Sequence, residues 1–508
     1  MATLALAQDN AFGQPLESQL RSCILAASIC EQADFDTTLR ETVYWVALMR
    51  YVGCTGHAHE VATVFGDEIA IRAQTLVHDA ANPAEVMRDV VAFATAGHAP
   101  DEQEQIVRTL QEGAHDWAVH NFAAGCEVAD MLLQRLDFDD PVRDALSFTF
   151  ERWNGNGFPA GASGEDIPLA MRVVHLSHDM EAIGRLFSPG HALDAARERR
   201  DSTYDPQLAD LFAANGDEWF ARLDKVDPWD AVLDLEPEPH RTLEGAALDD
   251  ALTVAADFID LKSPYMAGHS RRCAQLCEAA GTLLGFSDDD ATSLRRAALL
   301  HDFGTTAVPN SIWDKPGPLT RAEFDRVELH PMLTEQMLRR SPALAGLNPI
   351  AAAHHECADG SGYHKCLTVD RVHAGAGVLA AADIFVALTT ERADRPACTE
   401  SFAANELRQL ASKGSLTRTA VDAVLEAAGQ GRPLVHKPGK PVNQGGLTNR
   451  ELDVLRLASR GLTTKAIAER LFISAKTADH HIQHVYGKIG VSSRAAAALW
   501  AIQHAVVV

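Results

Sequence analysis

Residues 269–383 contain seven histidine and aspartate side chains that are candidate metal ligands, and they constrain the fold more than any other feature of the chain. In chain order they are His269, His301, Asp302, His330, His354, His355 and Asp383. Imidazole and carboxylate groups in this number suit two first-row divalent ions that share one carboxylate. Two such ions can activate a water molecule and bind a phosphoryl group. The segment must therefore fold so that positions far apart in the chain converge on one centre.

Apolar residues recur with helical spacing through most of the chain. The segments 247–261 and 291–300 place them at i, i+3, i+4 and i+7, whereas the alternation typical of strands is nearly absent. Clusters of glycine, proline and aspartate near 154–168, 304–318 and 358–366 indicate loops between helices. The pattern predicts an all-α fold.

Short strings around the seven ligands identify a family. They are HSRR (269–272), HDFG (301–304), WDKPGPLT (313–320), HP (330–331), HHECADGSGY (354–363) and ADIFVALTTER (382–392). In this order they resemble the HD-GYP phosphohydrolases, bacterial hydrolases of cyclic di-GMP, over roughly residues 250–430. The resemblance implies an HD-domain helical bundle with two divalent ions (Fe, Mn, Zn, Co or Ni) bridged by Asp302. It also implies that Arg392 and Arg395 contact phosphate.

Four positions depart from the family pattern. Thr305 replaces the lysine of HDxGK, Gly377 replaces an arginine, and His364 replaces the proline of GYP. Tyr265 stands where some members place a glutamate for a third metal, so a two-metal centre is expected. The lost lysine and arginine would stabilise negative charge in the transition state. We therefore expect weak or absent hydrolysis of cyclic di-GMP. The alternatives are a sensor that keeps the metals without catalysis and a packed cluster of structural histidines.

The N-terminal half resembles a second copy that has lost its ligands. ERWNGNGFPAGASGEDIPLAMRVV (151–174) is similar to the loop and helix that follow the paired histidines in the family. The ligand positions hold other residues, which are Arg50, Tyr51, Thr149, Phe150 and His178, and Cys54 replaces the lysine. His120 alone is expected to survive, at the histidine-proline step. This half should bind no metal, and its nearby histidines (His57, His59 and His78) are expected to be packing or surface residues.

The C-terminal segment 447–499 resembles the LuxR-type helix-turn-helix domain along its whole length. Thr448 and Glu451 have the spacing of a capping box at the start of a first helix. Ser474 is expected to cap a recognition helix over about 475–488, whose polar face would enter the major groove. Lysines would contact phosphates and the other polar side chains would contact base edges; the candidates are Lys465, Lys476, Lys488, Thr477, His480, His481 and His484.

The same segment is predicted to bind double-stranded DNA as a homodimer. Residues 447–508 hold eight Lys or Arg against four Asp or Glu, whereas the whole chain has a net charge of −25, so DNA contact must be local. The last helix, Ser492 to about Gln503, mediates dimerisation in many members of the family. Its small residues Ala495–Ala498 and Leu499 suit a close contact. The alternative is a small helical bundle that binds protein.

Length and composition predict three domains in a cytoplasmic protein. We place an HD-GYP-like domain without ligands at 18–225, a linker at 226–245, and a metal-binding HD domain at 246–428. A second linker at 429–446 precedes the DNA-binding domain at 447–508. Neither a signal peptide nor a membrane-spanning run of about 18 apolar residues is expected. Nine scattered cysteines without a CxxC motif suit reduced thiols.

These features favour a DNA-binding transcription regulator whose metal-containing HD domain senses or hydrolyses a phosphorylated nucleotide. Two alternatives stay open. One is a metal-dependent cyclic-dinucleotide phosphodiesterase with an accessory DNA-binding domain. The other is a structural regulator whose HD domains serve dimerisation.

Overall fold

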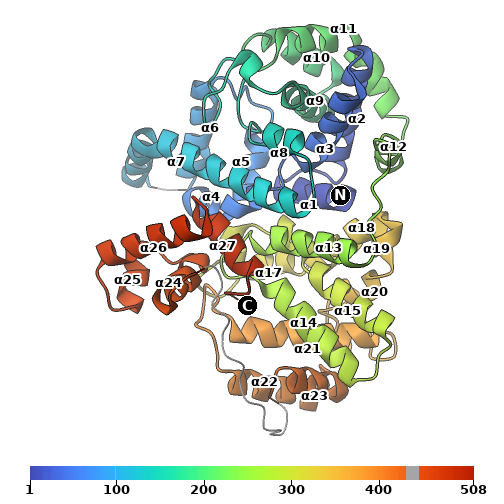
Figure 1. Ribbon diagram of the computed structural model, residues 1–508, viewed down its shortest axis with the longest axis vertical. Coiled ribbons are helices and arrows are strands. Elements are labelled where there is room, and N and C mark those ends of the chain that lie inside the picture. The colour runs from blue at the N-terminus through green and yellow to red at the C-terminus, as the bar shows by residue number, and fades with distance from the viewer. Residues whose placement is uncertain (98, 431–445, 508) are drawn as a thin grey trace. The chain divides into compact units, whose positions relative to one another are not determined.

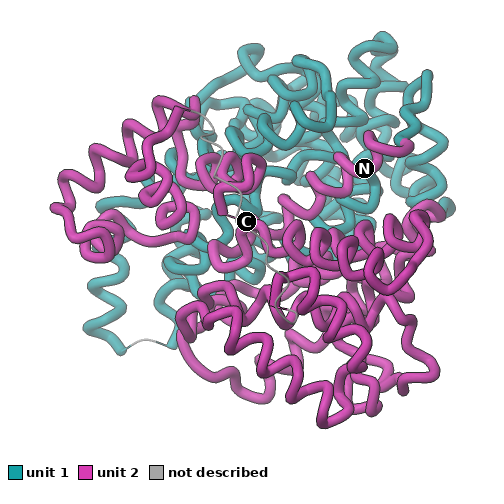
Figure 2. Tube along the Cα trace, turned by 60° about the horizontal axis from the view of Figure 1, so that its bottom comes forward, with its two compact units in different colours: residues 1–243 teal, residues 244–508 magenta. Residues whose placement is uncertain are grey.

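The computed structural model of the chain describes residues 1–97, 99–430 and 446–507, and these residues form helices without a β-strand (Figure 1). The predicted all-α class is therefore confirmed for the described part of the chain. Contacts between Cα atoms divide the chain into two compact units, Met1–Leu243 and Glu244–Val508, which Figure 2 colours separately. None of the described helices is long and apolar enough to cross a membrane.

The first unit contains twelve α-helices and two short 3₁₀ helices among its described residues. In chain order they are α1 (Ala2–Ala11), α2 (Ser18–Gln32), α3 (Thr37–Met49), η1 (Cys54–His57), α4 (Ala58–Phe65), α5 (Glu68–Thr75), α6 (Pro83–Thr95), α7 (Pro100–Arg135), α8 (Asp140–Leu146), η2 (Gly164–Asp166), α9 (Leu169–Leu186), α10 (Pro189–Glu198), α11 (Pro206–Leu223) and α12 (Pro228–Asp234).

The described part of the second unit continues the series. Its helices are α13 (Gly245–Asp260), α14 (His269–Leu283), α15 (Asp288–Leu300), η3 (Phe303–Ala307), α16 (Asn310–Trp313), α17 (Arg321–Val327), α18 (His330–Arg340), α19 (Pro342–Ala345), α20 (Asn348–Ala351), α21 (Ala374–Thr389), α22 (Glu400–Lys413), α23 (Arg418–Ala427), α24 (Asn449–Ser459), α25 (Thr464–Arg470), α26 (Ala475–Ile489) and α27 (Arg494–Gln503).

Several helices of the first unit have counterparts in the second. Helices α2 and α14 both have 15 residues, and each begins after a residue in the left-handed conformation, Glu17 (φ 78°) or Gly268 (φ 76°). Helices α3 and α15 both have 13 residues, and each is followed by a 3₁₀ turn. Helix α2 packs on α3 and α9, and α14 packs in the same way on α15 and α21. The arrangement is that of one HD bundle built twice.

Buried carboxylates fix the same loops in both copies. Asp9 accepts a hydrogen bond from the backbone N–H of Gln19, and Asp260 accepts one from the N–H of Ser270. Glu151 accepts from the N–H of Ala160 at 2.7 Å, and Glu356 accepts from the N–H of Lys365 at 2.7 Å. A buried carboxyl group that accepts backbone N–H bonds holds a loop firmly, because breaking those bonds would leave buried polar atoms without partners.

The structure describes the first predicted linker but only the ends of the second. The segment 226–245 is not simply an exposed connector, because α12 lies inside it. Trp229 and Val232 of that helix are buried, and the carbonyl of Val232 accepts a hydrogen bond from the Tyr44 hydroxyl at 3.0 Å. The second predicted linker, 429–446, lies outside the described residues over 431–445.

The last four helices form the predicted helix-turn-helix domain. Val454, Ile467, Ala468, Ala478 and Ile482 make one core cluster, in which α24, α25 and α26 meet. Thr448 and Glu451 form the predicted capping box, and the Ser474 hydroxyl accepts from the N–H of Thr477 at the start of α26. Caps of this kind satisfy N–H groups that have no partner inside the helix.

Most of the small residues expected to form a dimer surface on the last helix are buried within the domain, and Ala495 is half-buried. Residues Ala496–Leu499 are buried, and Ala497 belongs to a core cluster with Leu447, Leu455 and Val485. The small side chains allow α27 to approach α24 within the domain, so this stretch is not open to a second chain.

Candidate metal centre and nucleic-acid interface

The seven predicted ligands lie at the ends of helices or on one inward face. His269 is the first residue of α14, and His330 is the first residue of α18. His301 and Asp302 directly follow α15, and His354–His355 follow α20 after a short turn. Asp383 lies within α21, on which α14 packs. Helix ends allow the side chains to turn inward while the helices supply a rigid frame.

These side chains form two groups, and a third group that contains Asp302 shares one histidine with each of them. The ligand atoms of His269, Cys273, His301 and Asp383 all lie within 4.8 Å of one another. Those of His330, His354 and His355 meet the same limit, as do those of His301, Asp302 and His354. All seven predicted ligands therefore lie in one cluster, together with a cysteine that was not predicted.

Asp302 lies between the two groups, and each of its oxygens faces a different one. Its Oδ2 is 3.3 Å from Nε2 of His301 and 3.7 Å from Nε2 of His269. Its Oδ1 is 3.4 Å from Nε2 of His330 and 3.7 Å from Nε2 of His354. A carboxylate in this position can give one oxygen to each of two ions.

Three of the histidines have their ring orientation fixed by the backbone. Nδ1 of His301, His330 and His354 lies 2.6–2.8 Å from the carbonyl oxygen three residues earlier in each case. Because a carbonyl only accepts, each Nδ1 must carry the hydrogen. In its neutral form, each ring therefore turns an Nε2 lone pair toward the cluster, which is how outer-shell contacts prepare a metal ligand.

The charges of the site favour a bound cation. Burial alone would raise the pKa of Asp302, but the surrounding imidazoles, chiefly that of His301, hold it well below its usual range. Burial likewise opposes the charged form of His301, yet Asp302 and Asp383 raise its pKa to about 9. Without another positive charge nearby, the carboxylates of Asp302 and Asp383 therefore favour a proton on His301. Divalent ions would supply that charge and fit the nitrogen and oxygen donors present.

Buried polar atoms support the same fit. Nε2 of His301 is buried and makes no hydrogen bond, although Asp302 lies close to it. Nε2 of His330 and Nε2 of His354 are only 3.1 Å apart. Because both rings carry their hydrogen on Nδ1, two lone pairs face one another there, which is unfavourable unless a cation or an extra proton lies between them.

Three arginines surround the cluster, and they differ in their contacts. Asp383 and Asp302 both act on the charge of Arg392, whose pKa is lowered because burial outweighs them. Arg395 instead donates to the backbone carbonyls of Ala387 and Leu388 and so holds the loop after α21. Arg272 was not predicted; it lines a pocket with His269 and donates to the hydroxyl of Thr389.

The four residues that depart from the family pattern differ in their surroundings. Thr305 is buried and donates to the carbonyl of Asp302 at 2.6 Å, so its hydroxyl fixes the turn without supplying charge. A Cβ at Gly377 would have the Thr417 hydroxyl as its neighbour, at 3.8 Å, and would clash with nothing. His364 lies 3.2 Å from Glu335. Tyr265 lines the same pocket as His269.

Gly304 allows the turn after Asp302 to approach α18 closely. A Cβ built on it would lie 1.9 Å from the carbonyl oxygen of His330. We expect Gly304→Ala to displace the start of α18, to lower the free energy of unfolding by about 1–3 kcal/mol, and to weaken metal binding. Thermal unfolding and metal analysis would measure both effects. Gly346→Ala is the matched control, because nothing lies within 4 Å of its Cβ; equal effects of the two variants would contradict the prediction.

In the first unit, the corresponding positions form a closed network without a metal-type cluster among the described residues. Arg50 donates to the carbonyl of Val174, and its guanidinium lies 3.9 Å from Asp179. Asp179 also contacts Nδ1 of His178 and the hydroxyl of Tyr204, both at 3.1 Å. A fixed guanidinium there balances the buried carboxylate.

His120 does not hold the position expected for it. A Cβ on Gly53 would lie 1.9 Å from the carbonyl of Gly125, the same approach that Gly304 makes to His330. Gly125 is therefore the counterpart of His330, and His120 is exposed one turn earlier on α7. The ring of His57 lies against Gly125 at the place where a side chain of residue 125 would be, so His57 is a buried packing residue.

Helix α26, together with Lys465 on α25, presents most of the predicted DNA-contacting side chains to solvent. Lys465, Lys476, Thr477, His480 and His484 are exposed, but His481 is half-buried. The rings of His480 and His484 lie against one another, with centroids 4.1 Å apart. Lys488 lies 2.7 Å from Glu451, so part of its charge is neutralised within the domain.

Comparison with known proteins agrees with this geometry. The HD domain profile matches residues 120–208 and 253–416, and the profile of bacterial regulatory proteins of the luxR family matches 446–501. The chain is 30% identical over 405 residues to 3'3'-cGAMP-specific phosphodiesterase 3 of Vibrio cholerae, covering 78% of this chain and 87% of that protein.

Two further matches bear on the family. A cyclic di-GMP phosphodiesterase response regulator of Xanthomonas campestris is 31% identical over 36% of this chain and 48% of its own length. The crystal structure of a cyclic GMP-AMP-specific phosphodiesterase of V. cholerae is similar with a TM-score of 0.58 and 27% identity, covering 84% of this chain and 96% of that one. The chain belongs to the HD-GYP-type phosphodiesterase family, as a member with two HD segments and a C-terminal LuxR-family domain.

Proposed function

We propose that this protein is a DNA-binding transcription regulator whose second HD domain holds two divalent ions and binds or hydrolyses a cyclic dinucleotide. The observation that carries the proposal is the position of Asp302, whose two oxygens face two separate sets of histidine nitrogens. The seven candidate ligands would keep the roles given above, with Asp302 as the bridge.

The ligand that we propose first is 3'3'-cGAMP. The relative with the longest match acts, by its name, on that compound, and this chain covers most of its length. The cyclic di-GMP phosphodiesterase named above is covered over less than half of its length. The loss of cations at Thr305 and Gly377 also distinguishes this site from the pattern of cyclic di-GMP hydrolases.

The residues of the centre have separable roles in such a reaction. When bound, two divalent ions would supply Lewis acidity to a phosphodiester and lower the pKa of water. Asp302 would hold both ions, and the histidines would keep the site rigid through their backbone contacts. Arg392 lies close enough to interact with Asp302 and Asp383, so it would supply positive charge beside the phosphate.

The decisive experiment combines metal analysis with ligand titration of the full-length chain. Protein purified without oxygen should contain about two divalent ions per chain and should bind 3'3'-cGAMP more tightly than cyclic di-GMP or cyclic di-AMP. Absence of metal would contradict the metal centre. Metal without binding of any cyclic dinucleotide would contradict the ligand class only.

We expect weak or no hydrolysis of cyclic di-GMP, and a gain when the lost cation is restored. A single stabilising group of this kind is typically worth about 10²–10³ in rate, so Thr305→Lys should raise turnover by up to that factor. Thr305→Met, which has similar length without charge, is the control. Turnover of cyclic di-GMP by the native chain at the level of an intact family enzyme would overturn the prediction.

The competing function is a phosphodiesterase whose helix-turn-helix serves only localisation. It is favoured by the long match to a protein named as a phosphodiesterase. Rapid turnover of 3'3'-cGAMP, with DNA affinity that does not change with the nucleotide, would favour it. Slow turnover together with nucleotide-dependent operator binding would favour the regulator.

A further inference from the structure

We propose that the thiol of Cys273 is an additional ligand in the half of the centre formed by His269, His301 and Asp383, and that it makes this half selective for a soft divalent ion. The inference rests on the proposed metal centre. It goes beyond the seven ligands that the sequence pattern implies, because Cys273 belongs to none of the motifs.

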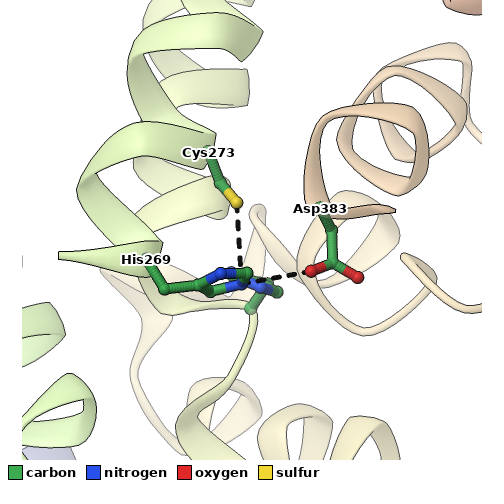
Figure 3. Close-up of side chains that lie close together, drawn as sticks. His269, Cys273 and Asp383 are labelled. Atoms are coloured by element: carbon green, nitrogen blue, oxygen red, sulfur yellow. Dashed lines mark hydrogen bonds and ion pairs between the residues drawn. The ribbon is translucent and has the colours of Figure 1, made fainter. Parts of the chain in front are cut away.

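The position of Cys273 in α14 brings its sulfur to the site. Cys273 lies four residues after His269, so both side chains share one face of the helix. Sγ of Cys273 is 3.6 Å from Nε2 of His269, and that nitrogen is 3.1 Å from Oδ1 of Asp383 (Figure 3). Ligands held about 2.0–2.3 Å from a tetrahedral ion lie roughly 3.3–3.8 Å apart, and the first of these separations falls in that range while the second is slightly shorter.

The four groups lie inside the protein, and His269 contacts both Cys273 and Asp383 among them. Cys273 is fully buried, and so is His301. Nε2 of His301 belongs to the same group of atoms within 4.8 Å and makes no hydrogen bond. The thiol can donate to His269 in the absence of an ion, and Nε2 of His301 then faces Oδ2 of Asp302 at 3.3 Å. One cation among the four groups would accept a lone pair from each of them.

A sulfur ligand would make the two halves of the centre chemically different. The half formed by His330, His354 and His355 offers only imidazoles beside Asp302. A thiolate is a soft ligand and favours Zn²⁺ or Fe²⁺ over Mn²⁺ and Mg²⁺. The thiol loses its proton when it coordinates, and the proton is released to solvent. We therefore expect the first half to retain Zn²⁺ where the second exchanges it for Mn²⁺.

X-ray absorption of the zinc-loaded full-length protein tests the proposal directly. A zinc–sulfur shell lies at about 2.3 Å, whereas nitrogen and oxygen ligands lie at about 2.0–2.2 Å. We expect a sulfur contribution of one atom shared over two zinc ions. Substitution of Co²⁺ should in addition give a sulfur-to-cobalt charge-transfer band in the near ultraviolet. Two zinc ions without a sulfur shell would overturn this inference and leave the metal centre intact.

Two variants assign the sulfur. Cys273→Ser should remove the sulfur shell and lower the affinity of one site for Zn²⁺ by at least the roughly 10–100-fold that outer-shell changes cause. The variant should fold, because Ser22 occupies the corresponding place in α2 of the first unit. Cys277→Ala is the control, since Cys277 is equally buried one turn further along α14 and Ala26 is its counterpart. Loss of the shell in this control alone would contradict the assignment.

A third variant separates ligation from packing. Cys273→Asp provides a hard ligand, so it should restore binding of a second ion while shifting the preference of that site toward Mn²⁺. If Cys273 only filled space, the aspartate would weaken folding and leave the preference among metals unchanged. If the chain bound no metal at all, the proposed function would fail together with this inference.

Discussion

Replacing Asp302 with alanine should remove most of the metal from the purified chain and abolish hydrolysis of cyclic dinucleotides. The bridging carboxylate serves both halves of the centre, so its loss weakens two sites at once. It also leaves the imidazoles of His301 and His330 facing one another without an anion between them. Elemental analysis after anaerobic purification should fall from about two ions per chain to well below one.

The same variant tests the first unit. Its ligand positions hold residues such as Arg50 and Tyr51, so no metal should remain elsewhere in the chain. Asp325→Ala is the matched control, because Asp325 is an exposed acid on α17 that pairs with Arg321 one turn earlier. Full metal occupancy in Asp302→Ala, or a stoichiometric ion that survives loss of the second-unit ligands, would contradict the assignment.

Replacing Lys476 with alanine should weaken DNA binding by roughly tenfold on all sequences, as expected for loss of a charge-assisted contact of about 1.5 kcal/mol. Lys476 is exposed in the first turn of α26, where a recognition helix meets phosphates. The slope of log affinity against log salt should fall by about one for each protomer bound. Binding titrations over a range of salt concentrations would measure both effects.

Base preference should depend on other side chains of the same helix. Thr477, His480 and His484 are exposed, so His480→Ala should relax preference at one base pair by about 1–3 kcal/mol. His481 is half-buried, and we expect His481→Ala to have the smaller effect on preference. Arg456→Ala serves as the charge control, since Arg456 lies on α24 and pairs with Asp453. A selection experiment that enriches no sequence, with or without cyclic dinucleotide, would contradict sequence-specific binding.

Dimerisation of the full chain stays a prediction, but its surface must lie elsewhere than on Ala496–Leu499. The sequence offered these small residues as a contact surface because small side chains permit close approach of helices. Close approach does occur, between α27 and α24 of the same domain. A run of small residues predicts close helix packing, but it does not show whether the second helix belongs to the same domain or to another chain.

The sequence by itself predicted the all-helical class, and its resemblance to the HD-GYP family suggested the second copy in the N-terminal half and the seven candidate ligands. Each of these depends on local spacing or on residue chemistry that survives without coordinates. Helical periodicity and the capping box at Thr448 can be read from the sequence, because a helix fixes the spacing between residues that interact.

Only the tertiary structure decided which further groups enter the centre and which expected ones do not. Cys273 lies beside His269 because both occupy one face of α14 and that face meets α21, a contact that no motif encodes. His120 was displaced from its expected place because Gly125, one turn later on α7, makes the close approach to Gly53. A ligand cluster is set by distances between helices that are remote in sequence, and those distances depend on the packing of the whole bundle rather than on any single segment.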